Sequence, residues 1–364
     1  MPLHAGGTTP FDISITPGIL SILTNFFGYL VGALGAAFYS PPGKQGFWFL
    51  FAVFLSAATT ILVTVSTGPW QQATMRFVGG IASAMVLVYA SALIIERLDG
   101  SGNNVLSNIH FSGVGFGIAF SAVIVTLIDG LGGGWQVMWG VSGMVALISL
   151  GVILLLIPSF SPIVEVEKSG RKFEFSNSLI KLILAYGLFG FGYVITATFL
   201  SVMVRGDPLL SPFEWLFWLA VGLAAIPSVA LWSAFGRWVN LKISFAVACI
   251  AEALGVMLSV AGLGPVAVMI ASILLGGTFM GITALGLILA REIVKGSVRK
   301  AFAWMTVAFG TGQMIGPAFA GMIFKETGSF FIASVCAAIA LFVGALMVMT
   351  VGQKHSRVRR VISR

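Results

Sequence analysis

The stretch FGTGQMIGPAFAG, Phe309 to Gly321, places four glycines, a glutamine and a proline inside an apolar run long enough to cross a bilayer. Gly312 and Gly316 are four residues apart and lie on one helix face, where a neighbouring backbone can approach closely. Pro317 has no N–H, so the carbonyl of Gln313 loses its helical partner and the helix can bend. Freed backbone groups persist at membrane depth only when they are buried in protein or face water. The stretch predicts either a tight helix crossing alone or a helix that also lines a moving cavity.

Composition excludes an ordinary soluble protein. Hydrophobic residues make up 58% of the chain and charged residues only 9%, whereas soluble domains carry about 25% charged residues. Cys249 and Cys336 both fall within apolar runs, which disfavours a disulfide framework or a cysteine metal site. Met1 to Pro17 has no basic segment of the kind that begins a signal peptide. The sequence therefore predicts an all-α polytopic membrane protein without cofactor or metal.

The apolar runs predict eleven spanning helices, at about 20 residues per span. Five are expected first, at Ile15–Phe38, Phe47–Thr67, Ala73–Ile95, Val105–Ile128 and Val137–Ile157. Six follow, at Ser178–Val204, Phe213–Phe235, Ile243–Leu263, Val266–Ala290, Ala301–Phe324 and Phe330–Val351.

A charged connector, Pro158 to Asn177, is the only long polar stretch between predicted spans. It divides the chain into an N-terminal bundle of five spans (1–158), a cytoplasmic connector (159–177) and a C-terminal bundle of six spans with a basic tail (178–364).

The basic residues predict the orientation, because cytoplasmic loops hold the excess of Lys and Arg. Arg205 and Lys325 fall on one side of the predicted spans, and Arg76 falls within a span. The other side holds Lys44, Arg97, Lys168, Arg171, Lys172, Lys181, Arg237, Lys242, Arg291, Lys295, Arg299, Lys300, Lys354, Arg357, Arg359, Arg360 and Arg364. We therefore expect a cytoplasmic C-terminus and, after eleven crossings, an extracytoplasmic N-terminus. The net charge of +8 is a sign of topology, and no basic soluble face points to nucleic acid.

Two glycine motifs recur at one spacing. RFVGGIASA aligns with ILLGGTFMG on Gly79 and Gly276 (276 − 79 = 197), and FSGVGFG aligns with FGTGQMIGP on Gly113 and Gly310 (310 − 113 = 197). A shared offset indicates an internal repeat. By this alignment the partner of Ser178–Val204 should precede residue 1, so we expect either a gene start placed too late or a naturally shortened chain.

These motifs also predict the positions of close helix packing or gating. The expected residues are Gly79, Gly80, Gly113, Gly117, Gly276, Gly277, Gly312, Gly316 and Pro317.

Five motifs together resemble the major facilitator superfamily of secondary transporters, and within it the bacterial YbfB/YjiJ type. They are NFFGYLVGALGA (25–36), RFVGGIASA (76–84), AYGLFGFGYVITATFL (185–200), GGTFMGITALGL (276–287) and FGTGQMIGPAFAG. The resemblance implies two bundles that rock about a central cavity. It also implies that the first predicted span corresponds to the family's second helix and that the family's first, arginine-bearing helix is absent. The cavity would be lined by the spans that contain Arg76, Tyr193 and Thr278.

Arg76 is the sharpest functional candidate. A guanidinium inside a span costs several kcal/mol unless it is paired or hydrated, and such residues are usually functional. The RFVGG run also resembles the family's fourth-helix arginine motif, which is associated with proton-coupled members. We hypothesise that Arg76 binds a substrate anion or modulates a proton site. The alternative is an arginine that reaches the nearby headgroups.

Two further ionisable residues lie in spans. Glu252 falls midway along ACIAEALGVML, where a bare carboxylate is disfavoured, so it is either a neutral acid bonded within the bundle or a proton carrier. His110 suits a proton relay, although a lone histidine is more often simply hydrogen-bonded.

Neutral polar and aromatic side chains suggest a small organic substrate. Tyr193 and Thr196 follow FGFG, and Asn25 and Tyr29 share one helix face. A mostly apolar cavity with a few placed polar groups would orient such a solute, whereas the alternative for each residue is helix packing at about 0.6 kcal/mol per contact. Gln313 stands beside the proline-freed backbone, which favours a gating or binding role.

The sequence contains no motif for catalysis or ATP hydrolysis. It predicts a monomeric secondary transporter in the bacterial inner membrane, working by alternating access and coupled to protons. Its expected partners are the lipid bilayer, a small-molecule substrate and protons. Export is slightly favoured over uptake, because the pattern around Pro317 resembles the family's antiporter motif. The alternative is a non-transporting sensor or an inactive truncated remnant.

Overall fold

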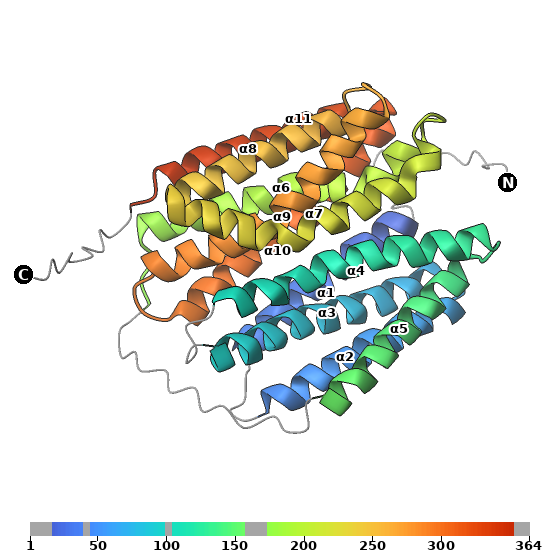
Figure 1. Cartoon of the computed structure of the whole chain (residues 1–364), viewed down its shortest axis with the longest axis horizontal. Coiled ribbons are helices and arrows are strands. Elements are labelled where there is room, and N and C mark those ends of the chain that lie inside the picture. The colour runs from blue at the N-terminus through green and yellow to red at the C-terminus, as the bar shows by residue number, and fades with distance from the viewer. Residues whose placement is uncertain (1–16, 39–43, 99–103, 157–172, 353–364) are drawn as a thin grey trace, which may run out of the picture.

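The computed structural model describes residues 17–38, 44–98, 104–156 and 173–352, which form eleven α-helices and two short 3-10 helices. The helices run side by side along the long axis of the molecule (Figure 1). They are α1 (Pro17–Phe38), α2 (Gln45–Leu62), α3 (Pro69–Leu98), α4 (Asn104–Gly130), α5 (Trp135–Leu156), α6 (Asn177–Arg205), α7 (Glu214–Trp238), α8 (Leu241–Ser259), α9 (Pro265–Ile293), α10 (Val298–Thr327) and α11 (Phe331–Met349). Most of the predicted connector and the basic tail lie outside the described residues.

The predicted all-helical membrane fold is confirmed. Ten helices are long and apolar enough to cross a membrane, and α1 contributes a shorter apolar stretch, Leu20–Ala36. Within the described residues the only β-type pairing is one isolated bridge between Glu174 and Lys295. These two residues also form a salt bridge of 3.7 Å, so the end of the connector is tied to the loop between α9 and α10.

Several helices, among them α6 and α10, extend past the predicted apolar runs and end at capping residues. The α6 helix begins where the Ser176 hydroxyl accepts a hydrogen bond from the Leu179 N–H at 3.2 Å, which satisfies a free donor of the first turn. The α10 helix ends at Gly328, whose φ of 67° is a conformation that glycine adopts without strain. Apolar patterning locates the middle of a span, whereas the caps decide its ends.

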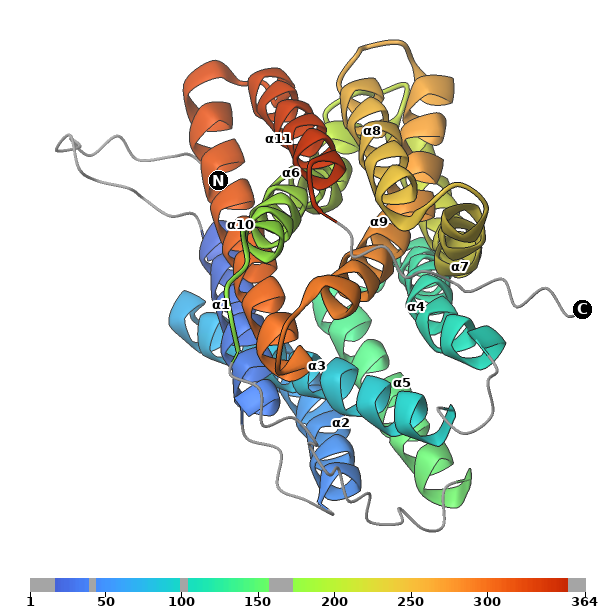
Figure 2. The ribbon, with the colours of Figure 1, turned by 90° about the vertical axis from the view of Figure 1, so that its left-hand side faces the viewer.

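The helix pairs in contact repeat between the two parts of the chain. The α1, α2, α3 and α5 helices pack on one another as α7, α8, α9 and α11 do. The α1 helix contacts α10, and in the same way α7 contacts α4. Seen from one end, α1 to α5 lie on one side and α6 to α11 on the other (Figure 2). These contacts are the pattern expected for two bundles related by a repeat.

Close backbone approaches recur with the repeat. A Cβ added at Gly80 would overlap the carbonyl oxygen of Asn25, and one added at Gly276 would overlap that of Val221. Both residues of the second pair are 196 positions after those of the first (276 − 80 = 196 and 221 − 25 = 196). The contacts therefore repeat one residue out of step with the 197-residue offset of the glycine motifs. The predicted division of the chain into an N-terminal bundle (1–158), a connector (159–177) and a C-terminal bundle (178–364) stays a prediction.

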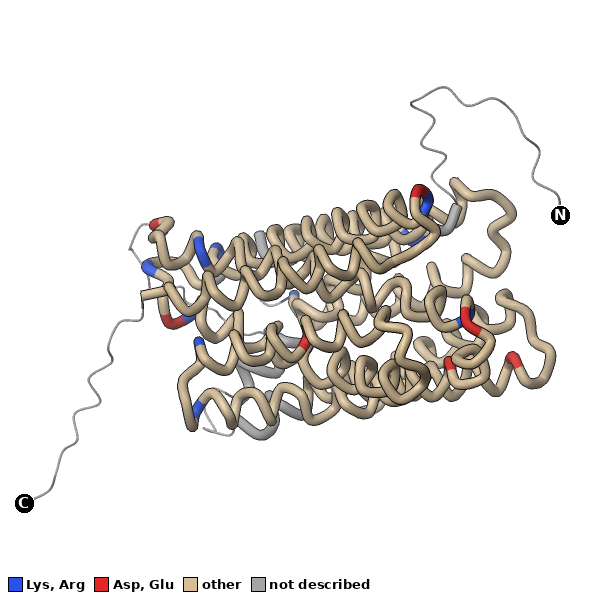
Figure 3. The backbone as a smooth tube through the Cα atoms, turned by 90° about the horizontal axis from the view of Figure 1, so that it is seen from above, with Lys and Arg blue, Asp and Glu red and all other residues tan. Residues whose placement is uncertain are grey.

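The charged residues gather at the two ends of the bundle (Figure 3). Arg205 and Lys325 belong to one end, where Arg205 Nε bonds Glu214 Oε2 at 2.6 Å. Residues of the other end include Lys44, Lys181, Arg237, Lys242, Arg291, Lys295 and Lys300. Between the ends, large apolar side chains such as Leu155 and Leu231 are exposed, as expected for surfaces that face lipid.

Candidate functional site

A side chain from α7 bonds to the backbone of α9, which runs as one helix from Pro265 to Ile293. The Gly281 N–H donates to the Ser228 hydroxyl oxygen at 3.0 Å, and the same hydroxyl donates to the Gly277 carbonyl at 2.8 Å. The hydroxyl therefore lies between the donor and the acceptor that a regular helix would pair. Trp232 Nε1 donates to the same Gly277 carbonyl at 2.7 Å. Insertion of a side chain into the backbone ladder is a recognised cause of helix bending.

Glu252 meets α9 one residue further along, from the α8 side. Its side chain is 1% exposed, the Thr278 hydroxyl bonds its Oε2, and its Oε1 has no partner in the described structure. The Thr278 hydroxyl also donates to the Leu274 carbonyl at 2.7 Å. A hydroxyl has one proton to donate, so a proton on the carboxyl would let both contacts be satisfied together.

Tyr193 and Gln313 are brought together from α6 and α10. Gln313 Nε2 donates to the Tyr193 hydroxyl at 2.6 Å. Gln313 is 6% exposed, and its Oε1 has no partner among the described residues. Rings of Phe279 and Phe309 lie nearly parallel to the Tyr193 ring, at centroid distances of 6.0 Å and 5.7 Å. A polar pair and an aromatic stack thus share one place between α6, α9 and α10.

The glycines of α10 make the tight crossing expected of Phe309–Gly321. A Cβ at Gly312 would overlap the carbonyl oxygen of Gly187 on α6, and one at Gly316 would lie 2.7 Å from Val194 Cγ1 and 2.9 Å from the Phe191 carbonyl oxygen. Pro317 follows inside the same helix. Close packing and a missing backbone bond therefore coincide on α10.

The packing prediction for α4 needs correction. A Cβ at Gly113 or Gly117 would meet nothing within 4 Å, whereas one at Gly115 would lie 2.5 Å from the backbone nitrogen of Ile226 on α7. The Ser112 hydroxyl donates to the carbonyl of the same Ile226 at 2.7 Å. The sequence alignment selected the wrong glycines because it cannot tell which helix face meets a neighbour. Gly79 and Gly277 are also less crowded than Gly80 and Gly276.

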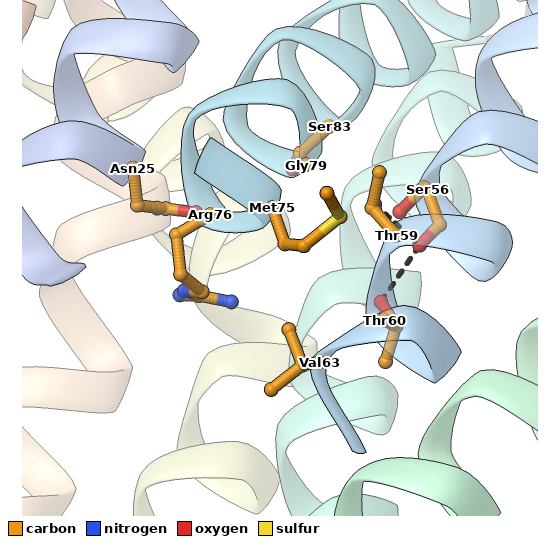
Figure 4. Close-up of a pocket in the computed structure, with 9 residues that line it drawn as sticks. All are labelled: Asn25, Ser56, Thr59, Thr60, Val63, Met75, Arg76, Gly79 and Ser83. Carbon is orange, nitrogen blue, oxygen red and sulfur yellow. Dashed lines mark hydrogen bonds between the residues drawn. The ribbon is translucent and has the colours of Figure 1, made fainter. Parts of the chain in front are cut away.

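Arg76 lines a polar pocket of about 230 Å³ between α1, α2 and α3. Figure 4 shows Asn25 beside Arg76, with Ser56, Thr59 and Thr60 across the pocket. The guanidinium carbon lies 5.0 Å from the centroid of the Trp139 ring on α5, a cation–π contact. Neither of the two salt bridges within the described residues involves Arg76. The pocket therefore holds a cation that no described carboxylate neutralises.

Three predicted residues lie outside these polar contacts. Tyr29 is half-buried on α1. Thr196 is 1% exposed, and its hydroxyl has no partner in the described structure. His110, half-buried in the first turns of α4, has its ring 5.1 Å from that of Phe111. It belongs to the end of the bundle opposite that of Arg76.

The described residues contain no group of three or more His, Cys, Asp or Glu side chains that could hold a metal ion. Cys249 and Cys336 are both free cysteines.

Residues 10–349 match the protein family described as "Uncharacterised MFS-type transporter YbfB". The chain belongs to this family. The resemblance seen in the five motifs is thereby confirmed, and the protein is a multi-pass membrane transporter of the major facilitator type. A transporter of this family, rather than an enzyme, accounts for the helical bundle and its internal polar groups.

A solved structure shows the same fold. The crystal structure of a point mutant of the nucleoside transporter NupG matches 93% of this chain and 90% of its own, with a TM-score of 0.68 and 13% identity. Identity this low carries the fold and not the substrate. No curated protein matches the sequence.

Sequence reasoning missed Ser228, Trp232, Phe279 and Phe309 of this family member. The available signal was Pro227, which lies inside α7 and directly precedes Ser228. A serine beside a proline in a span suggests an interrupted helix. The sequence did not reveal that Ser228 bonds the backbone of α9, because Ser228 and Gly277 are 49 positions apart.

Proposed function

We propose that the protein moves a small organic solute across the bacterial inner membrane by alternating access coupled to protons. The observation that carries the proposal is the set of hydrogen bonds that Ser228 and Glu252 make with α9. The α9 backbone at Gly277 and Gly281 is bonded from one side by Ser228, and Thr278 between them is bonded from the other side by Glu252. A protonatable group is therefore bonded to a helix at the point where that helix can bend.

Alternating access requires surfaces that slide. The α4 helix meets α7 through small residues: a Cβ at Gly222 would overlap the backbone of Ala119, and Gly115 lies on the backbone of Ile226. At the second contact between the bundles, a Cβ at Gly310 of α10 would meet the side chain of Leu30 at 3.2 Å. Helices that touch through small residues can rock without unpacking long side chains.

Proton coupling would pass through Glu252. An ionised carboxylate buried with one hydroxyl donor is costly, and the Thr278 contacts are satisfied by the protonated form. Release of that proton would leave a buried charge and drive α8 and α9 to rearrange. Protonation and the shape of α9 are then coupled in both directions, as linkage requires.

For Arg76 we propose contact with an anionic group of the solute or control of a proton site. The supporting observation is a half-buried guanidinium on a polar pocket, with an aromatic ring and no described carboxylate beside it. An uncompensated charge at this depth is expensive, so a function that uses the charge accounts for its presence.

The remaining features of the proposal follow from the sequence. The end of the bundle with more Lys and Arg faces the cytoplasm, export is slightly favoured over uptake, and the chain works as a monomer.

Flux through the reconstituted full chain tests the proposal. Proteoliposomes should accumulate or expel an identified solute when a proton gradient is imposed, and a protonophore should abolish the gradient-driven movement. Flux that continues unchanged without the gradient would refute proton coupling alone. Absence of flux for every solute would instead favour the non-transporting sensor or truncated remnant.

A further inference from the structure

Five aromatic side chains gather where three helices of the C-terminal half meet. We call Tyr186, Phe189, Tyr193, Phe279 and Phe309 the aromatic cluster; the first three belong to α6, and the others to α9 and α10. The ring centroids of Phe189, Phe309 and Phe279 lie 5.1 Å, 5.7 Å and 6.0 Å from that of Tyr193. Two of its helices, α6 and α9, are among the cavity-lining helices that the family resemblance implies.

Three rings of this cluster, those of Tyr193, Phe279 and Phe309, share one orientation. The planes of Phe279 and Phe309 deviate from that of Tyr193 by 7° and 8°. By contrast, Phe191 and Phe319, on the same two helices α6 and α10, meet at 48°. Parallel, offset rings present their faces in a common direction. A further flat ring can therefore stack on this set more readily than on tilted pairs.

The stacked rings are incompletely buried although they lie inside the bundle. Tyr193, Phe279 and Phe309 are all half-buried, whereas Tyr186 and Phe189 behind them are 3% and 1% exposed. The cluster therefore has a packed back and an accessible front. Next to Phe309, a Cβ at Gly310 would lie 3.2 Å from the Leu30 side chain of α1, so this part of the cluster lies near the other bundle.

A hydrogen-bonding edge lies beside the stack. Gln313 Nε2 donates to the Tyr193 hydroxyl, which leaves Gln313 Oε1 as a buried acceptor without a described partner. The Tyr193 hydroxyl in turn keeps its own proton free to donate. A buried unpaired carbonyl is unfavourable, so a ligand that brings an N–H gains a bond that the protein alone does not make. The pair offers one acceptor and one donor, side by side.

The cluster also carries no formal charge. Its members are two phenols and three phenyl rings, and its polar neighbour Gln313 is neutral. Glu252 acts electrostatically on Tyr193, but its carboxyl is bonded to Thr278. An uncharged solute avoids the desolvation cost that an ion would meet here.

We propose that the aromatic cluster, with Gln313, binds an uncharged planar heterocycle whose edge carries an N–H next to a carbonyl. The ring would stack on the faces of Tyr193, Phe279 and Phe309, the N–H would donate to Gln313 Oε1, and the carbonyl would accept from the Tyr193 hydroxyl. The inference rests on the proposed transport function and names its substrate class. For an uncharged solute, Arg76 takes the second of its two proposed roles, control of a proton site.

Binding of matched probes to the full chain in nanodiscs tests this substrate class. The planar probes are uracil and hypoxanthine, each with an N–H beside a carbonyl. Dihydrouracil keeps that edge but loses the flat aromatic ring, and 1,3-dimethyluracil keeps the ring but loses both N–H donors. We expect at least one planar probe to raise the unfolding temperature in a saturable way. Loss of flatness or of the N–H should weaken its binding about tenfold. Equal binding of the matched probes, or binding of neither planar probe, would overturn the inference.

Variants locate the binding site. Phe279→Leu and Phe309→Leu should each weaken binding of the planar probe about three- to tenfold, whereas Phe319→Leu, outside the cluster on α10, should leave it unchanged. Tyr193→Phe keeps the ring and should weaken binding through loss of the donor. The unfolding temperature without probe identifies any variant that fails to fold. Unchanged binding in both leucine variants of the cluster would place the probe elsewhere and refute the inference.

The proposed function fails separately. Flux of a non-planar solute without planar binding would leave transport standing and the substrate class refuted. Binding of a planar probe without any flux would leave the ligand class standing and refute the transport function.

Discussion

The N-terminal helices α1 and α3 pack as α7 and α9 do, yet the two pairs use opposite chemistry at the same position. In the first pair, a Cβ at Gly32 of α1 would overlap the carbonyl oxygen of Ile81 on α3. At the positions 196 residues later, Ser228 of α7 bonds the carbonyl of Gly277 on α9. Where the first pair has a glycine that lets two helices touch, the second pair has a serine whose hydroxyl bonds the backbone of the neighbouring helix.

Burial follows the same division. Buried residues make up 61% of the α9 span and 50% of the α6 span, against 28% in α3 and 11% in α4. The C-terminal half therefore places Glu252, Tyr193 and Gln313 in a dense interior, whereas Arg76 of the N-terminal half borders an open polar pocket. The repeat supplies the framework, and each half adds its own polar groups. Five sets of substitutions test whether this difference is functional.

Glu252→Gln should have the largest effect. The glutamine amide can donate to Thr278 as the protonated acid does, so folding should be retained, but no proton can be released. Accumulation driven by a proton gradient should fall at least about tenfold, while exchange of solute between the two sides continues. The measurement is gradient-driven uptake beside counterflow in proteoliposomes. Glu292→Gln, at the exposed end of α9, is the control, and full accumulation by Glu252→Gln would exclude Glu252 as the proton carrier.

Arg76→Ala should lower the transport rate by about tenfold, equivalent to about 1.4 kcal/mol, because it removes the charge of the N-terminal pocket. Arg76→Lys should retain part of the activity, since lysine keeps the charge but lacks the planar group that lies over Trp139. Initial rates with an identified solute provide the measurement. Wild-type rates in both variants would return Arg76 to a headgroup anchor.

Gly115→Ala and Gly113→Ala test the contact between the halves. The first places a methyl group against the α7 backbone and should cost about 1–3 kcal/mol of stability. The second meets open space and should change stability by less than about 0.5 kcal/mol. Thermal unfolding in detergent compares the two, and equal losses would contradict the observed packing of α4 on α7.

Ser228→Ala should reduce transport a few-fold and change stability by only about 1 kcal/mol. Without the hydroxyl, the Gly281 N–H and the Gly277 carbonyl lose a side-chain partner, and α9 should bend less readily there. Hydrogen exchange at Gly281 and the transport rate are to be measured together. Ser272→Ala is a matched control. Like Ser228, Ser272 is fully buried, but it lies on α9 itself and bonds only the carbonyl of Val268 in the same helix. An unchanged transport rate in Ser228→Ala would mean that the contact of Ser228 with α9 has only a structural role.

Pro317→Ala should have the smallest effect, a reduction in transport of about two- to threefold, equivalent to about 0.4–0.7 kcal/mol. Alanine restores the N–H that pairs with the Gln313 carbonyl, so α10 should become straighter and bend less readily. Membrane insertion should stay normal, and comparison of insertion with flux is the check. A loss of folding alone would reduce this stretch to a packing element.

The spans, the repeat and the family could all be predicted from the order of residues along the chain. Spans are local, because about 20 apolar residues must cross the bilayer whatever surrounds them. The recurrence of GG in α3 and α9 survives as a spacing along the chain. The same reading marked Glu252, Tyr193, Gln313 and Arg76, because polar groups in apolar runs stand out.

Which of these groups meet depends on the packing of the helices. Gln313 and Tyr193 are 120 positions apart, and Ser228 contributes to α9 only because α7 packs on it with one helix face. Each residue of a helix points about 100° away from the one before it, so Gly113 and Gly115 lie on different faces of α4. Only Gly115 lies on the face that touches α7. Periodicity fixes the faces of each helix, but only packing of the two bundles fixes which faces meet.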